Sequence, residues 1–185
     1  AIYQTFLQHI IFSLKPDGKA AVVVPSGFIT ANSGIDKKIR QKLVDDKMLR
    51  GVVGMPSNIF ATTDTSVSIL FIDKTNKENL VLIDATSLGR KIKEGKKKKT
   101  LLSKKYEAQI IDTFSKKRVI DDFSVVLSYE DIAAKKYSFS AGQYFDIKIK
   151  YTDISKNEFK LKIESHQKII KKSFEESKKI ESEIF

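Results

Sequence analysis

The chain has 185 residues, enough for about one domain with an appendage, and 41% of them are hydrophobic, enough for a sizeable core. It has no Cys and only two His, His9 and His166, far apart in the sequence. This excludes a disulfide scaffold and a thiolate nucleophile and leads us to expect no metal site. The net charge of +11 favours a polyanionic partner such as nucleic acid, and a generally lysine-rich surface is the alternative.

No apolar run approaches the ~20 residues of a membrane span, and the first residues lack the basic leader and cleavage site of a secretory signal. We therefore expect a soluble, cytoplasmic protein with no membrane partner.

The first segment predicts a helix followed by a strand. Apolar residues at three- and four-residue steps predict a helix over residues 1–14, and Pro16-Asp17-Gly18 predicts a turn. The apolar run 20–24, ended by Pro25, predicts a central strand covered by helices on both faces. Because ligands in α/β sheets bind outside the carboxyl ends of strands, the loop 25–31 is either a candidate site or an ordinary connection to the next helix.

The next segment predicts one more helix and three more strands. The helix covers residues 35–46, with Ser33 and Asp36 spaced as a capping box, and the strands cover 49–55, 66–73 and 80–84. Short connections require antiparallel neighbours, so this order indicates the closing edge of a mixed sheet. The opening strands that would carry a phosphate-binding Gly-rich turn are missing from the sequence.

A strongly basic stretch follows the predicted sheet. Residues 90–105 hold nine basic residues and one acidic residue, with no interleaved aromatic residue for base stacking. The stretch predicts either a flexible loop that contacts phosphates or a merely solvated loop.

The rest of the chain is predicted to be mainly helical. Ser103 is placed to cap a helix, and Ser128–Asp131 and Ser155–Glu158 have capping-box spacing. The last helix runs from about residue 156 to the end, with a narrow apolar seam that suits packing on a partner helix or on its own domain.

The residues themselves show no complete active site. There is no nucleophile elbow of the G-x-S-x-G type and no Walker-type phosphate loop. The adjacent carboxylates at 45–46 and 121–122 point in diverging directions and are typical of surface charge.

Three stretches carry a resemblance to a known family. Residues 18–74 read GKAAVVVPSGFITANSGIDKKIRQKLVDDKMLRGVVGMPSNIFATTDTSVSILFIDK and resemble the later part of the adenine-specific DNA methyltransferase domain in type I restriction–modification systems. The stretches SLGRKIKEGKKKKTLLS and DDFSVVLSYEDIAAKKYSFSAGQYFDIK resemble the segment that follows this domain in the same modification subunits.

The resemblance implies methyl transfer from S-adenosylmethionine to the exocyclic amine of adenine in the intact subunit. The family's Gly-rich cofactor loop and its Asn-Pro-Pro-aromatic motif are both absent here, since Pro16, Pro25 and Pro56 are the only prolines and none follows Asn. We therefore expect no catalytic or cofactor-binding residue in this chain and no bound cofactor. A non-catalytic DNA-binding or subunit-assembly fragment is the alternative function.

The resemblance also implies site residues. In related enzymes an aromatic residue before the strand that matches SVSILF lies against the extruded adenine, and the resemblance implies that Phe60 has this role here. The alternative is that Phe60 is a core anchor between two strands. The neighbouring Asn58, Thr62 and Thr63 either line the base pocket or form a turn. The expected phosphate contacts are Lys96, Lys97, Lys98 and Lys99.

The predicted fold class is α/β, the C-terminal part of a Rossmann-like methyltransferase mixed sheet with a helical C-terminal extension. We expect the sheet in residues 1–86, a basic loop in 87–105 and a mostly helical assembly extension in 106–185. The partners implied by the resemblance are DNA and the specificity and restriction subunits of the same system.

Overall fold

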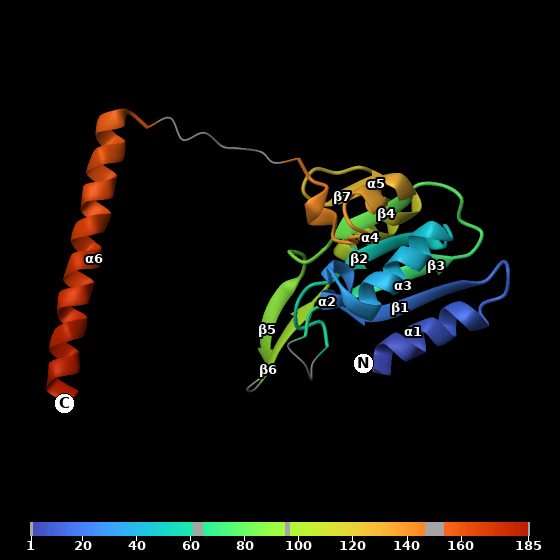
Figure 1. Ribbon diagram of the computed structural model, residues 1–185, viewed down its shortest axis with the longest axis horizontal. Coiled ribbons are helices and arrows are strands. Elements are labelled where there is room, and N and C mark those ends of the chain that lie inside the picture. Colours follow the sequence, from blue (N-terminus) through green and yellow to red (C-terminus); the bar gives the residue numbers. More distant parts are fainter. Residues whose placement is uncertain (1, 61–64, 95–96, 147–153, 185) are drawn as a thin grey trace. The chain divides into compact units, whose positions relative to one another are not determined.

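The computed structural model describes residues 2–60, 65–94, 97–146 and 154–184 (Figure 1). The chain divides into two compact units, residues 1–146 and 147–185.

A mixed sheet forms the centre of the first unit. In the described residues it has five strands in the order β1-β3-β2-β4-β7. β2 is parallel to β4, whereas the pairs β1–β3, β2–β3 and β4–β7 are antiparallel. The strands are β1 (Lys19–Pro25), β2 (Leu49–Gly54), β3 (Val67–Asp73), β4 (Leu80–Asp84) and β7 (Ser124–Leu127).

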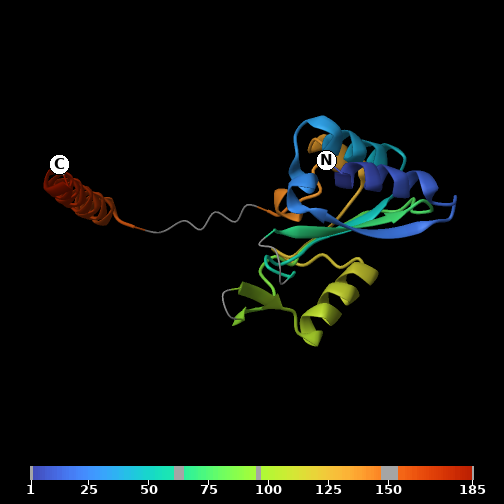
Figure 2. The same cartoon turned by 90° about the horizontal axis from the view of Figure 1, so that it is seen from below.

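Helices cover both faces of this sheet. Apolar side chains alternate between the faces along each strand, so that Val52 and Leu82 belong to one core and Val53 and Ile83 to the other. Figure 2 shows α4 (Lys104–Ser115) on the opposite face from three helices that share the first core. These are α1 (Ile2–Ser13), α3 (Gly34–Asp45) and α5 (Tyr129–Ala134), and they are joined there by the short α2 (Ser26–Thr30) and by the 3₁₀ turn η1 (Ala141–Gln143).

The packing of α4 on the sheet explains a glycine in β2. The Phe114 ring of α4 lies 4.6 Å, centroid to centroid, from the Phe71 ring of β3. A Cβ added to Gly51 would lie 2.7 Å from Phe114 Cε2 and closer still to the Val81 carbonyl oxygen. Position 51 therefore has no room for a side chain.

Most predicted elements are confirmed. The helix over 1–14, the strand 80–84 and the final helix correspond to α1, β4 and α6 (Lys156–Ile184). Ser103 caps α4 by accepting a hydrogen bond from the Tyr106 amide. Two of the three predicted capping boxes form, at Ser128–Asp131 and Ser155–Glu158. In each, the Ser hydroxyl accepts a hydrogen bond from the N3 amide and the N3 carboxylate accepts one from the Ser amide.

The basic stretch is not a loop, contrary to the expectation for residues 87–105. The antiparallel strands β5 (Arg90–Glu94) and β6 (Lys97–Leu101) form a separate two-stranded hairpin. The sheet also extends past the predicted boundary at residue 86, because β7 pairs with β4.

Three finer expectations about the sheet and its helices are wrong. β1 lies at the edge of the described sheet with alternately exposed side chains, so it is not covered on both faces. β3 and β4 have opposite directions but are not neighbours, because the connection between them passes across β2. Ser33 makes no side-chain cap; the Asp36 carboxylate instead accepts hydrogen bonds from the Tyr3 hydroxyl at 2.8 Å and from Gln4 Nε2 at 2.7 Å, which ties α1 to α3.

The second unit contains α6, a single helix of 29 residues. None of the helices in the described ranges combines the length and apolarity needed to cross a membrane.

Candidate functional site

The carboxyl ends of three parallel strands meet at one edge of the sheet. Pro25 ends β1, Gly54 ends β2 and Asp84 ends β4, while β3 begins there at Val67. The strand register places Pro25 opposite Val67, and Gly54 is paired with both Ser68 and Asp84. Ligands of open α/β sheets bind at this edge, which makes it the candidate ligand site of this sheet.

A cavity of about 440 Å³ opens at this edge. Its walls come from α2, from the start of β3, from the end of β4 and from residues 139–141, so the loop 25–31 singled out in the sequence contributes to it. Its described polar lining consists of hydroxyl groups and one carboxylate, with no lysine or arginine among the described residues. The polar lining residues are Ser26, Thr30, Ser66, Ser68, Asp84, Thr86 and Ser140.

Two polar side chains of the lining, Asp84 and Ser68, differ in their hydrogen bonding. Asp84 Oδ1 accepts hydrogen bonds from the Thr86 amide at 3.0 Å and the Thr86 hydroxyl at 2.5 Å, a local turn that fixes the carboxylate. Ser68 is fully buried, and its hydroxyl has no hydrogen-bond partner in the described structure. An unpaired buried hydroxyl costs free energy, so the orphaned Ser68 Oγ marks a place where a ligand or water would be stabilising.

One buried arginine holds two walls of the cavity together. Arg40 of α3 is fully buried and donates to the backbone carbonyls of Phe28, Ala31 and, at 2.7 Å, Tyr137. Its guanidinium lies 5.7 Å from the Phe28 ring centroid and 5.8 Å from that of Phe139. Burial lowers the pKa of this guanidinium from its ordinary value, while Asp36 and two tyrosines oppose the shift. Arg40 thus joins α2 to the segment that enters η1.

The loop after β2 is anchored to the basic hairpin. The Thr100 amide donates to the Asn58 carbonyl at 2.9 Å, and the Thr100 hydroxyl donates to the Ser57 carbonyl at 2.7 Å. Asn58 Nδ2 donates to the Lys98 carbonyl at 3.5 Å, and Asn58 has a φ of 58°, a left-handed conformation that Asn tolerates. Phe60 follows with 46% of its surface exposed and belongs to neither core.

The hairpin carries like charges directly opposite one another. Lys93 of β5 is the cross-strand partner of Lys98 of β6, and both are exposed. Such a pair is destabilising unless an anion lies between or above the two ammonium groups. The hairpin therefore presents positive charge that an anionic partner would relieve.

The structure brings together only part of the predicted site. Asn58 is bonded to the hairpin at Lys98 and Thr100, Phe60 follows two residues after Asn58, and Lys99 lies between Lys98 and Thr100 on β6. The predictions for Thr62, Thr63 and Lys96 lie outside the described residues, as does the side chain of Lys97.

The sequence pointed to one wall of the cavity, the loop 25–31, but not to its other walls or to Arg40. Arg40 stands in a helix beside Lys37 and Lys38, and nothing in that pattern separates it from surface charge. The serine cluster around Ser66 and Ser68 was the one available signal, because a serine in the middle of an apolar strand is unusual.

Comparison with known proteins places these features in a family. The sequence pattern of the family described as N-6 DNA Methylase matches residues 3–153. The chain is 29% identical over 87% of its length to the type I restriction enzyme MpnII methylase subunit of Mycoplasma pneumoniae, and 24% identical over 97% of its length to the MjaIX methylase subunit of Methanocaldococcus jannaschii. It spans 28% and 33% of those two proteins, about a third of their length.

A solved structure agrees with the sequence relatives. The methyltransferase subunit of a type I restriction–modification system from Streptococcus thermophilus has a similar fold, with a TM-score of 0.68 and 25% identity, over 77% of this chain and 30% of that one. The mixed sheet is therefore the C-terminal part of a Rossmann-like methyltransferase fold, and the chain belongs to the N-6 DNA methylase family.

Proposed function

We propose that this chain forms the target-base side of the DNA modification subunit in a type I restriction–modification system. In the intact subunit a methyl group would pass from S-adenosylmethionine to the exocyclic amine of adenine. Family membership and the names of the relatives support the methyltransferase class.

The observation that carries the proposal is the joining of two elements at the carboxyl edge of the sheet. Residues 57–60 and the basic hairpin share three hydrogen bonds, and the cavity opens at the same edge. An enzyme that acts on an extruded base needs an apolar face for the base and positive charge for the neighbouring phosphates. Residues 57–60 would supply the apolar face, and the basic hairpin would supply the positive charge.

Phe60 is the residue that would stack on the extruded adenine. Its half-exposed ring and its place outside both cores favour this role over that of a core anchor. Asn58 would hold the loop in position through its backbone and side-chain bonds to the hairpin. Thr62 and Thr63 are proposed to line the same pocket, on the family resemblance alone.

The lysines of the hairpin would contact the DNA backbone. The opposed, exposed pair Lys93 and Lys98 supports this role, and Lys99 is adjacent on β6. Lys96 and Lys97, in the same run, are proposed to act in the same way.

The residues of the cavity do not fit S-adenosylmethionine. The methionine part of that cofactor carries a carboxylate besides its ammonium and sulfonium groups; Asp84 suits only the two cations, and the described lining offers no cationic side chain for the carboxylate. We therefore assign no cofactor contact and no step of methyl transfer to this chain.

A second function applies to the 185 residues taken alone. They contain neither the Gly-rich cofactor loop nor the Asn-Pro-Pro-aromatic motif, and they span about a third of the relatives. By themselves they would bind DNA or assemble with other subunits without methylating.

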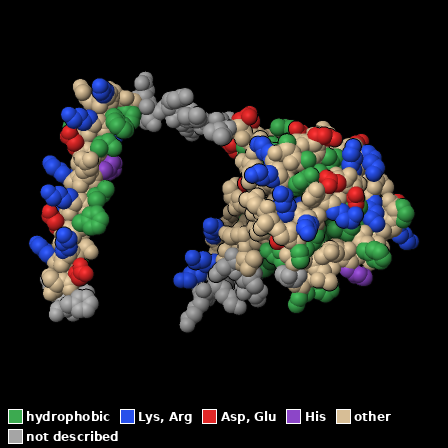
Figure 3. Space-filling view, viewed as in Figure 1, with side chains coloured by type: hydrophobic (Ala, Val, Ile, Leu, Met, Phe, Trp, Pro, Cys, Tyr) green, Lys and Arg blue, Asp and Glu red, His purple; other side chains and the backbone are tan. Residues whose placement is uncertain are grey.

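The C-terminal helix would bind a helix of another subunit. Among the described residues of α6, large apolar side chains at four- to seven-residue intervals are all at least 43% exposed, and they occur between lysines and glutamates (Figure 3). Such a seam is typical of helix pairing. The specificity subunit is the proposed partner, with the restriction subunit joining the same assembly. The seam consists of Phe159, Ile163, Ile170, Phe174 and Ile180.

The base-stacking role is tested in the intact subunit with its specificity subunit. Phe60→Ala should lower kcat/KM for methylation by roughly 5- to 150-fold, the equivalent of about 1–3 kcal/mol of stacking, and Phe60→Tyr should restore most of it. Val119→Ala, at another exposed apolar residue, serves as control. Unchanged kinetics in Phe60→Ala would remove Phe60 from the site.

The phosphate contacts are tested by the salt dependence of DNA binding. Replacing Lys93 and Lys98 by Gln should reduce the slope of log K against log[salt] by about 0.9 for each lost contact. The same replacements at Lys15 and Lys77, which are exposed near the opposite edge of the sheet, remove equal charge and should leave the slope close to its original value. Equal slopes for both double variants would refute a specific role for the hairpin.

The assembly role is tested by co-purification with the specificity subunit. Ile170→Glu places a charge in the seam of α6 and should abolish the complex, whereas Lys168→Glu on the outer face should retain it. Retention of the complex in both variants would exclude the seam as the contact.

A further inference from the structure

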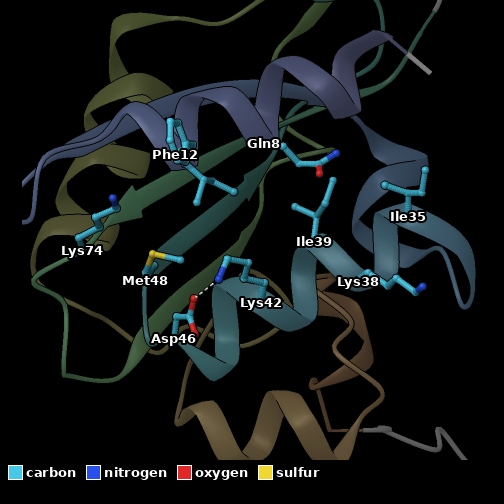
Figure 4. A pocket seen from close by; sticks show the side chains of 10 residues that line it. Gln8, Phe12, Ile35, Lys38, Ile39, Lys42, Asp46, Met48 and Lys74 are labelled. Carbon is cyan, nitrogen blue, oxygen red and sulfur yellow. Dashed lines mark hydrogen bonds and ion pairs between the residues drawn. The ribbon is translucent and has the colours of Figure 1, made fainter.

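A second depression lies between α1 and α3, away from the site described above. It is a groove of about 700 Å³ (Figure 4). Its floor is apolar and buried, formed by Ile11, Ile39 and Met48. Met48 directly precedes β2, so the groove approaches the amino edge of the sheet rather than the carboxyl edge.

Large apolar side chains remain exposed at the rim of this groove. Phe12 of α1 is 86% exposed and Ile35 of α3 is 51% exposed, and both line it. Ile2 and Phe6 of α1 are also exposed, although they stand among polar residues of the same helix. Large apolar side chains that are gathered at one exposed rim mark a surface that a partner would cover.

Lysines flank the apolar floor. Lys38, Lys42 and Lys74 line the groove, and its one carboxylate, Asp46, is already bound by Lys42 at 2.6 Å (Figure 4). Lys74 Nζ donates to the Leu14 carbonyl at 2.5 Å, which leaves its positive charge uncompensated. The rim thus has a net positive charge around an apolar centre.

We propose that this groove binds an amphipathic helix with an acidic flank, carried by a partner protein. A channel between two helices of 12 residues accepts the ridge of a third helix, whose apolar residues would contact Phe12, Ile35 and Ile39. Glutamates or aspartates beside that ridge would pair with the rim lysines, and charge complementarity of this kind selects the partner.

α6 of this chain does not suit the groove, because its charge does not complement that of the rim. Residues 156–184 contain eight lysines and six glutamates, so α6 has a net positive charge like that of the rim. An acidic helix from another protein has the complementary charge.

The test uses the 185-residue chain and two labelled synthetic peptides, read by fluorescence anisotropy. Both peptides are amphipathic helices with the same leucine face; one has glutamate flanks and the other lysine flanks. The acidic peptide should bind at least 10-fold more tightly. Phe12→Ser or Ile35→Ser should weaken it at least 10-fold, and Lys38→Glu should reduce the preference for acidic flanks. Ile111→Ser, at a 64% exposed residue of α4, is the matched control.

Three outcomes would overturn the proposal: equal affinity for both peptides, unchanged binding in Phe12→Ser, or equal loss in Ile111→Ser. The titration is repeated with the intact subunit, which should bind the acidic peptide with similar affinity. Binding by the 185-residue chain but not by the intact subunit would mean that the subunit covers the groove itself, which also refutes a partner protein. Because the groove variants leave Phe60 and the hairpin unchanged, methylation kinetics test the proposed function separately.

Discussion

Replacing Arg40 tests whether one buried guanidinium joins the walls of the cavity. Its three donated bonds to backbone carbonyls are charge-assisted, worth roughly 1.5–3 kcal/mol each, or about 5–9 kcal/mol in total. The cost of burying the charge, several kcal/mol, offsets part of this gain. Arg40→Met retains much of the volume but leaves the carbonyls of Phe28, Ala31 and Tyr137 unpaired. We expect a net loss of about 3–5 kcal/mol in the free energy of unfolding.

Thermal and urea unfolding, followed by tyrosine fluorescence, measure this loss in the 185-residue chain. At about 2–4 °C per kcal/mol for a chain of this size, Arg40→Met should lower the Tm by roughly 10 °C. Arg40→Lys keeps the charge but not the planar fork, so it should recover less than half of the loss. Arg118→Met is the control, because its guanidinium is half exposed and pairs with Asp112 at the surface. An Arg40→Met chain within 1 kcal/mol of the original would refute this account of the cavity walls.

Three further predictions concern single buried or capping groups. Asp73→Asn should cost about 1–3 kcal/mol at pH 7. Burial raises the pKa of Asp73, but hydrogen bonds from Thr75 and Lys19 outweigh burial and lower the pKa below its ordinary value. The stabilisation by Asp73 is therefore present at neutral pH and is lost as the pH falls below about 4. The original chain and the variant should converge in stability during acid unfolding, and a difference that does not depend on pH contradicts this prediction. Ser128→Ala should cost about 1 kcal/mol in urea unfolding through loss of the capping box, and a neutral result would show that the cap contributes nothing. Gly51→Ala should cost at least about 1–3 kcal/mol, because the added Cβ would collide with the Val81 carbonyl of β4 and the Phe114 ring of α4, and a Tm equal to the original would contradict this tight packing.

The sequence was sufficient to predict most helices and strands of the first unit but not the order of the strands. Apolar runs such as residues 80–84 specify buried strands locally. The crossing from β3 to β4 over β2 depends on which strands pair across the sheet, and a six-residue connection contains no information about that. The edge position of β1 could not be predicted for the same reason, since a run of valines fits a central strand and an edge strand equally well.

The hairpin was missed because its stability comes from outside the segment. Between residues 90 and 99 only Ile92 is apolar, and the lysine run reads as a solvated loop. The bonds from Thr100 to Ser57 and Asn58 fix β6 against a loop about 40 residues earlier in the chain. Such pairing is tertiary, and no local pattern predicts it.

The candidate site was predictable only where a resemblance pointed to it. The family resemblance pointed to Phe60 and Asn58; the structure bonds Asn58 to the basic hairpin, and the base-binding role of both residues stays a prediction. Arg40 and Ser68 could not be identified, because only their burial distinguishes them from an ordinary helix arginine or strand serine, and burial is determined by the fold.

The pairing of β4 with β7 has a consequence for the segment between them. Ile83 and Ser124 are cross-strand partners, so residues 85–123, with the hairpin and α4, leave the sheet and return to it at adjacent points. The entropy of closing such an excursion grows only slowly with its length. A change in the length of its connecting loops therefore costs little and need not shift β4 and β7, which stay paired where the excursion leaves and re-enters the sheet.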